Sequence, residues 1–203
     1  MNILKRAVSV AFAVSVSSAA ATATVTETDP AFHHDLKING GEYELRLDLS
    51  FSKEISLEEI ERNLKDGKLL AKLGSKVKDI VIHKVRDNVY DATTVVKSWG
   101  FTTKMVSRCR ELSDKTNWAR ECRLDTEQLD ASKYMVWKRD SMRCERRPEG
   151  VKCKAQIVGE VKPFTLLGFE LISKEKFAAS VKAEAIENFK KLWSYTEETH
   201  VRR

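Results

Sequence analysis

The sequence predicts an α+β domain in which a curved antiparallel sheet of about seven strands surrounds one long C-terminal helix. Three observations support this fold class. Residues 174–198 contain no Gly or Pro and carry apolar side chains at helical spacing. Apolar and polar residues alternate in residues 42–51 and through most of 76–161. The four cysteines form two pairs, each flanking turn-like sequence, as expected for stapled hairpins.

The N-terminus has the pattern of a secretory signal peptide over residues 1–23. A basic start ending in Lys5-Arg6 precedes an apolar run over residues 7–16, and small residues then allow cleavage after Ala21 or Ala23. A membrane anchor is the alternative, but the apolar run is shorter than the ~20 residues that span a bilayer. We therefore expect export, to a bacterial periplasm or to the extracellular space; the lack of an N-x-[ST] sequon in the mature chain favours a bacterial source.

The two cysteine pairs predict structural disulfides, because an oxidising destination gives an even cysteine count this meaning. Four cysteines allow three pairings. The spacing favours Cys109–Cys122 and Cys144–Cys153, since each pair flanks a turn and hairpin strands bring partners within disulfide reach. Zinc is the alternative, but the gaps are wider than the two to four residues typical of each half of a zinc site. No metal site is expected.

The first part of the chain predicts an arm, a strand and a broken helix. Residues 24–41 are polar and lack periodicity, so we expect a flexible arm that carries His33 and His34 in solvent. Residues 42–51 alternate and predict a half-buried strand. Ser56 and Glu59 have the spacing of a capping box, which starts a helix. Glycines at 67 and 74 divide that helix into two short pieces.

The middle of the chain predicts antiparallel strands joined by tight turns. Asp87-Asn88 supplies the first turn, Gly100 marks a reversal, and Pro148 and Gly150 suit positions i+1 and i+3 of a type I turn. Residues 164–169 are expected to form a loop packed on the core. The expected strands are 77–85, 89–99, 101–112, 118–124, 134–146 and 151–161.

The C-terminal helix is expected over residues 174–198, with Ser173 as its N-cap and residues 199–203 as a tail. The apolar positions that recur at helical spacing are Phe177, Val181, Ala185, Phe189, Leu192 and Trp193.

This order of elements resembles the helix-grip fold shared by START lipid-transfer domains, birch-pollen-allergen proteins and polyketide cyclase-like proteins. The resemblance covers residues 42–198 and depends on element order and length. One departure is Arg86-Asp87-Asn88, which stands where plant members carry a glycine-rich loop. The resemblance implies an internal cavity between sheet and helix that holds a sterol, phospholipid, quinone, polyketide or hormone.

Small and flexible apolar residues on the expected inner faces are the candidate cavity lining. Met105 and Ser107 share a strand face with Cys109, opposite the basic Lys104 and Arg108, and the last strand offers small side chains on one face. A well-packed core is the alternative. The ligand-binding candidates are Met105, Ser107, Asp140, Met142, Ala155, Ile157, Val181, Ala185 and Phe189.

Asp140 and Lys138 raise a separate question. If Cys144 faces Cys153, both charged residues share the side of Met142 and Ile157. Buried charges are costly unless paired. They are therefore either polar anchors at a cavity or residues that a β-bulge turns outward, and we favour the bulge.

The formal net charge is +6, or +4 without Lys5 and Arg6, and the excess basic residues gather in the last two hairpins. A solvated sheet face is the simpler interpretation, and contact with an anionic membrane surface is the alternative. The basic residues concerned are Lys104, Arg108, Arg110, Arg120, Arg123, Lys138, Arg139, Arg143, Arg146, Arg147, Lys152 and Lys154.

No catalytic motif, cofactor fingerprint or nucleic-acid-binding module is present in the sequence. We therefore expect an exported monomer that binds or carries a hydrophobic small molecule or lipid, with no cofactor and no nucleic-acid partner. One alternative is a cavity enzyme of cyclase or hydrolase type, for which His83, Asp140 or a nearby Tyr is the first candidate. The other is a protein whose basic surface binds anionic envelope material.

Overall fold

The computed structural model describes residues 31–74, 76–98, 101–125, 127, 135–166 and 169–201. The expected signal peptide and residues 24–30 of the expected arm lie outside the described residues, as does most of the loop that precedes the second stapled hairpin. Within the described part of the chain, no helix has both the length and the apolar character needed to cross a bilayer.

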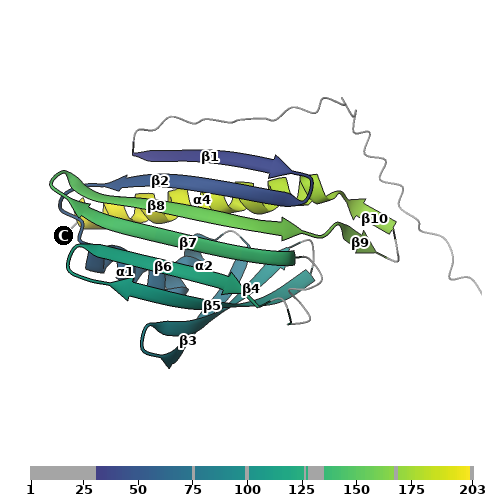
Figure 1. The fold of residues 1–203 in the computed structure, drawn as a ribbon, viewed down its shortest axis with the longest axis horizontal. Coiled ribbons are helices and arrows are strands. Elements are labelled where there is room, and N and C mark those ends of the chain that lie inside the picture. Colours follow the sequence, from purple (N-terminus) through teal and green to yellow (C-terminus); the bar gives the residue numbers. More distant parts are fainter. Residues whose placement is uncertain are drawn as a thin grey trace, which may run out of the picture.

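An eight-stranded antiparallel sheet carries three helices on one face (Figure 1). Its strand order is β1-β2-β8-β7-β6-β5-β4-β3, and β9 and β10 form a separate two-stranded sheet. The strands are β1 Phe32–Asn39, β2 Glu42–Phe51, β3 Val77–Arg86, β4 Val89–Ser98, β5 Phe101–Ser113, β6 Asn117–Leu124, β7 Met135–Arg147, β8 Gly150–Val161, β9 Phe164–Leu166 and β10 Phe169–Ile172. The helices are α1 Leu57–Lys65, α2 Gly67–Leu73 and α4 Lys174–Val201.

The α+β class and the element order are confirmed, with one strand more than expected in the main sheet. The extra strand is β1, so the expectation of an irregular arm over residues 24–41 is wrong for Phe32–Asn39. Phe32, His34 and Leu36 occupy every second position of β1 and point toward the core. The polar composition of the segment made this period of two hard to recognise in the sequence. The placement of His34 in solvent was also wrong, since it is only 4% exposed.

Each of the two short helices begins at a capping side chain, and the first cap, Ser56, is the one that the sequence predicts. Ser56 accepts a hydrogen bond from the Glu59 backbone N–H at 3.1 Å and caps α1. Asp66 ends α1 and its side chain caps α2 by accepting from Leu69 N–H at 3.0 Å. The break therefore lies at Asp66, and Gly67 serves a close approach: a Cβ there would lie 2.2 Å from the Ile80 carbonyl oxygen.

The long helix α4 lies along β2, with its ends held by named contacts. Trp193 Nε1 donates to Ser50 O at 2.9 Å, and Glu197 accepts from Ser52 N–H at 2.9 Å. Ser173 accepts from Lys176 N–H at 3.4 Å, as expected for the N-cap. The helix continues to Val201, so most of the expected tail over 199–203 is helical.

The core lies between this helix and the inner face of β1, β2 and β8. The alternation of residues 42–51 places Tyr43, Leu45, Leu47, Leu49 and Phe51 in it, all at most 5% exposed. Burying a large aliphatic or aromatic side chain stabilises a fold by about 1.5–3 kcal/mol, so β2 is a major source of stability.

Both disulfides have the expected pairing, Cys109–Cys122 and Cys144–Cys153. Each joins directly opposed residues of one hairpin, β5–β6 or β7–β8. All four sulfurs lie on the inner face, where the cysteines are at most 4% exposed.

Two of the predicted turns are also present, and Gly100, where a further reversal was expected, lies outside the described residues. Asn88 has a φ of 60° between β3 and β4, and Arg147 lies opposite Gly150 across the β7–β8 turn. The segment expected as a loop over 164–169 instead contributes to the β9–β10 pair.

Candidate functional site

The candidate site is the part of the sheet's inner face that α4 does not fill. Inward side chains on β2 and β8 are at most 7% exposed. On β4 and β5 the inward residues, which pair as Ala92–Ser107, Thr94–Met105 and Val96–Thr103, are only half-buried. Accessible surface therefore remains on the face that carries the helices.

The register places the predicted lining residues on this inner face. Asp140 lies opposite Ile157, and Met142 lies opposite Ala155. Met105 and Ser107 lie on β5, and Ala185 and Phe189 face the core from α4. The side chain of Val181 lies outside the described residues. The structure thus brings β7, β8 and α4 candidates together, with the β5 candidates two strands away from β7.

Lys138 and Asp140 both point inward, so the favoured interpretation that a bulge turns them outward was wrong. The bulge lies between Met135 and Trp137, with Val136 as the additional residue. From Lys138 onward the simple register holds, and Lys138 lies opposite Gly159. The two side chains form an ion pair of 3.4 Å, which offsets the cost of placing charges on an inner face.

This ion pair retains accessible surface although the helices cover the face. The side chain of Lys138 is 30% exposed and that of Asp140 is 23% exposed. Charges that border accessible space keep part of their hydration, whereas charges in a filled core lose it. The pair therefore borders accessible space on the inner face of the sheet.

The Tyr43 hydroxyl lies beside the same ion pair. Tyr43 and Lys138 flank Gly159 on adjacent strands, and a Cβ at Gly159 would lie 2.7 Å from the Tyr43 hydroxyl oxygen. The phenol therefore crosses over Gly159 toward Lys138. Its hydroxyl is buried and has no hydrogen-bond partner within the described residues.

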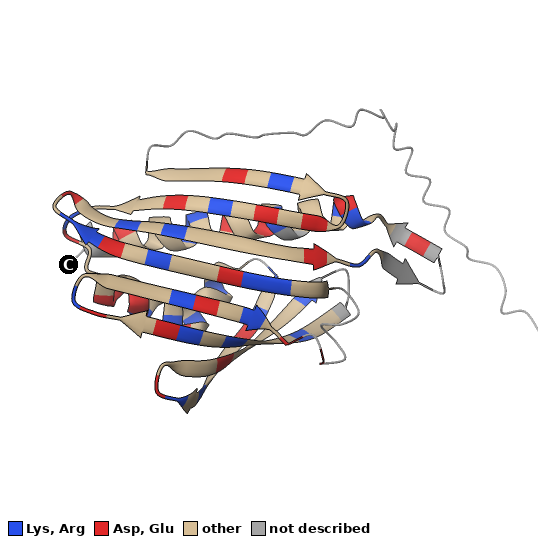
Figure 2. Ribbon diagram, viewed as in Figure 1, with Lys and Arg blue, Asp and Glu red and all other residues tan. Residues whose placement is uncertain are grey.

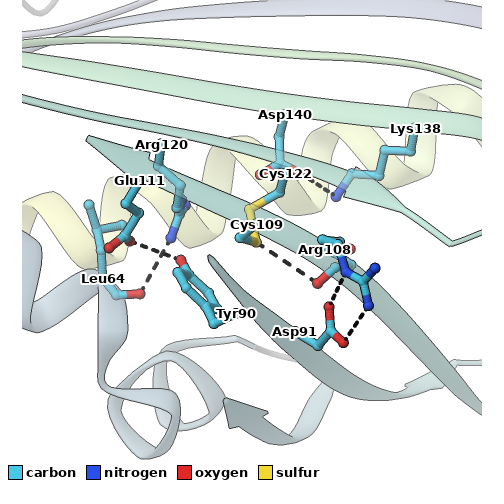
Figure 3. Close-up of a disulfide and its surroundings, with 11 residues drawn as sticks. Leu64, Tyr90, Asp91, Arg108, Cys109, Glu111, Arg120, Cys122, Lys138 and Asp140 are labelled. Atoms are coloured by element: carbon cyan, nitrogen blue, oxygen red, sulfur yellow. Dashed lines mark hydrogen bonds and ion pairs between the residues drawn. A yellow bond between two sulfur atoms is a disulfide. The ribbon is translucent and has the colours of Figure 1, made fainter. Parts of the chain in front are cut away.

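Arg120 completes what we call the inner polar cluster, which consists of Tyr43, Lys138, Asp140 and Arg120. Its Nη1 donates to the Leu64 carbonyl at 3.5 Å (Figure 3). Its guanidinium lies 5.7 Å from the Trp118 ring centroid. Among the described residues, no carboxylate lies within ion-pair distance of it.

A neighbouring network ties α1 to the sheet. Glu111, on β5, accepts from the Tyr90 hydroxyl at 3.0 Å (Figure 3). Its carboxylate also pairs with Lys65 at the end of α1. Lys65 also pairs with Glu61, and Glu111 lies directly opposite Arg120 in the β5–β6 register, so the two cations and the two carboxylates of this network balance.

Burial and charge shift several pKa values in this region. Burial raises the pKa of Tyr43, and the nearby Lys138 opposes that rise. The Asp140 carboxylate raises the pKa of Lys138 against the effect of burial. Burial also raises the pKa of Tyr90 to about 12. All three groups therefore keep their protons at neutral pH.

Tyr43 and Arg120 were missed by sequence reasoning. Tyr43 stood within an alternating apolar face, where nothing marked its hydroxyl as unpaired. Arg120 was counted among basic surface residues, but it shares the inward parity of Trp118 and Cys122. Its spacing of two residues from each of these buried side chains is the sequence signal that would have placed Arg120 on the inner face.

His83, one of the candidate catalytic residues, lies exposed on β3, and its partner in the β3–β4 register is Asp91. Among the described residues no group of His, Cys, Asp and Glu has the arrangement of a metal site. A depression of about 430 Å³ on the outer face, near Leu112 and Arg143, includes none of the predicted lining residues.

No protein-family model and no curated protein sequence matches the chain. Solved structures do match it. The STAR-related lipid transfer protein from Xanthomonas axonopodis has a TM-score of 0.64 and 11% identity, covering 85% of this chain and 98% of that one.

Human StAR-related lipid transfer protein 5 has a TM-score of 0.62 and 10% identity, covering 90% of this chain and 89% of that one. Zhui aromatase/cyclase from Streptomyces has a TM-score of 0.59 and 10% identity, covering 77% and 94%. The order, register and helix placement described above, together with these likenesses, show that the chain has the helix-grip fold found in lipid-transfer and aromatase/cyclase structures.

Proposed function

We propose that this protein binds a hydrophobic small molecule or lipid between the inner face of its sheet and helix α4. The observation that carries the proposal is the accessible surface of Lys138 and Asp140, at 30% and 23%, on a face that the helices cover. Half-buried apolar side chains such as Met105 and Phe189 supply the rest of the lining. This combination of apolar walls and few polar groups is typical of small-ligand sites.

The fold supports the same function. Two of the similar structures are named as lipid transfer proteins and a third as an aromatase/cyclase. A lipid is a hydrophobic ligand, and the half-buried inner face of this chain offers apolar surface for such a ligand. We propose the predicted lining residues, from Met105 to Phe189, as contacts of that guest.

A space-filling substitution tests the proposal. Ser107 is half-buried on the inner face, whereas Lys104 on the same strand is exposed on the outer face. Ser107→Trp is expected to reduce binding of a neutral apolar dye such as Nile red by at least tenfold. Lys104→Trp, the matched control, is expected to leave it unchanged. Equal dye binding by both variants and the native protein would contradict the proposal.

We also propose that the protein acts after export, in the periplasm or outside the cell. The two disulfides are consistent with an oxidising compartment. The test is N-terminal mapping of protein recovered from the cell envelope, where cleavage after Ala21 or Ala23 is expected. Recovery of reduced, uncleaved protein from the cytosol would contradict it.

One observation favours a second candidate function, binding to an anionic membrane surface. Arg108, Arg123 and Arg139 lie directly opposite one another on β5, β6 and β7, on the outer face shown in Figure 2. We call these three residues the arginine row. Their side chains are at least 50% exposed, and they share the carboxylates of Asp91 and Glu121.

Like charges directly opposite one another destabilise a sheet, so the arginine row has a cost that an anionic partner would offset. The test is co-sedimentation with phosphatidylglycerol vesicles, with phosphatidylcholine vesicles as control. Binding to the anionic vesicles alone, lost between 50 and 500 mM salt and weakened in Arg123→Gln, is expected. Salt-independent binding to both vesicle types would contradict this function.

A further inference from the structure

We propose that the ligand carries an anionic oxygen group, a carboxylate or a phosphate, and that the inner polar cluster receives it. This inference deepens the proposed function and depends on it. It names the chemical class of the guest from groups that the fold leaves unsatisfied.

The first argument counts donors. The buried Tyr43 O–H has no acceptor within the described residues. A buried polar group without a partner costs about 1–3 kcal/mol, so an acceptor from a ligand would recover that energy. The Lys138 ammonium carries three donors, and Asp140 is the one partner the described residues supply. The cluster is thus short of acceptors rather than donors.

The second argument concerns the kind of acceptor. Lys138 pairs with Asp140, and Arg120 lies directly opposite Glu111, which shares Lys65 with Glu61, so the charges already present balance. The site therefore needs acceptors and no further donors. A carboxylate or a phosphate offers acceptors, whereas a hydroxyl group would bring a donor of its own.

The third argument concerns space. Gly159 separates Tyr43 from Lys138, and any side chain there would collide with the Tyr43 hydroxyl or, at 2.9 Å, with the Trp137 carbonyl. The absence of a side chain lets the phenol cross toward Lys138, so two donors from different strands converge. Lys182, a buried cation on α4, does not join them. It lies on the same side of α4 as Trp193, eleven residues later, whose ring contacts Phe32 of β1.

Two substitutions are expected to act in opposite directions. Lys138→Met removes a donor and a positive charge, so we expect dodecanoate to bind at least tenfold more weakly. Asp140→Asn removes the one negative charge of the cluster, so we expect dodecanoate to bind several-fold more tightly. Damage to the fold would weaken binding in both variants, and only an electrostatic site gives opposite signs.

The experiment measures displacement of Nile red by dodecanoate, dodecyl phosphate and dodecanol, which share one alkyl chain. The native protein is expected to bind at least one of the two anions about tenfold more tightly than dodecanol, and the tighter anion identifies the head group. Lys154→Met, an exposed lysine on the outer face of β8, is the matched control and should change nothing. The double variant Lys138→Met/Asp140→Asn leaves no buried charge unpaired and should lose the preference.

The outcomes separate the two proposals. If none of the three amphiphiles displaces the dye, the proposed function itself fails. If dodecanol binds as tightly as both anions, or if Asp140→Asn weakens anion binding as Lys138→Met does, the proposed function stands and this inference is overturned.

Discussion

Replacing Lys182 by Met should stabilise the protein, although most core substitutions destabilise. Lys182 is 2% exposed on α4, and no ion pair to it is found among the described residues. Burial alone lowers its pKa from 10.5 to about 8. At about 1.4 kcal/mol per pKa unit, holding the charged amine in the folded state costs about 3.5 kcal/mol at neutral pH. Met keeps the apolar stem, so we expect a gain of about 2 kcal/mol.

The pH dependence of this gain follows from proton binding. Between pH 8 and 10.5 the unfolded chain keeps the Lys182 proton that the folded protein has released. The unfolded state then binds more protons, so native stability rises with pH through this window. The advantage of Lys182→Met should therefore be fully present below pH 8 and shrink above it.

Urea unfolding of both proteins at pH 7.0 and pH 9.5 measures this difference directly. Groups that titrate alike in both proteins cancel in the comparison, and all four cysteines are disulfide-bonded, so no thiolate forms as the pH rises. A variant that is less stable than the native protein at pH 7, or an advantage that is the same at both pH values, would refute the reasoning.

Two further predictions concern the β7–β8 hairpin. Cys144→Ala/Cys153→Ala opens a cross-link over nine residues and should lower the free energy of unfolding by about 2.5 kcal/mol in urea titrations; no change would mean that the hairpin needs no covalent support. Gly150→Ala should cost more than 2 kcal/mol, because φ is +138° and the new Cβ would lie 2.0 Å from the Phe51 carbonyl oxygen. Gly40→Ala is the matched control, with φ of +58° and no atom within 4 Å of the new Cβ, and should cost about 1 kcal/mol. Equal losses at the two glycines would show that the close approach at Gly150 is unimportant.

Local patterns predicted most of the fold because each depends on neighbours in sequence. The alternation of residues 42–51 and the capping box at Ser56 both correspond to elements at the expected positions. The strand β1 was not predicted, for two reasons. One of its inward positions holds a histidine, His34, which breaks the apolar pattern, and pairing with β2 stabilises the strand more than its composition does. A bulge was expected to turn Lys138 and Asp140 outward, but the bulge lies before them, at Val136, because its position depends on the pairing of β7 with β8.

The candidate site was predicted less completely, because it depends on parity across several strands. The inward parity of Asp140 and Ile157 followed from the position of the cysteines. The convergence of Tyr43 and Lys138 could not be predicted, since it requires β2, β8 and β7 to be neighbours in that order and Gly159 to lie between the two side chains. Sequence proximity contains no information about that order, because β2 and β8 are about 100 residues apart.

The disulfides have a consequence for the site that goes beyond stability. A slip of one residue in the pairing of two strands moves every side chain of one strand to the opposite face. In β7 such a slip would bring Arg139 to the inner face and send Lys138 and Asp140 outward. Cys144–Cys153 prevents this in the β7–β8 pair, and Cys109–Cys122 fixes β5 against β6, with Cys122 directly opposite Asp140. The two cross-links therefore hold the inner polar cluster and the outer arginine row on their separate faces, whether or not a ligand is bound.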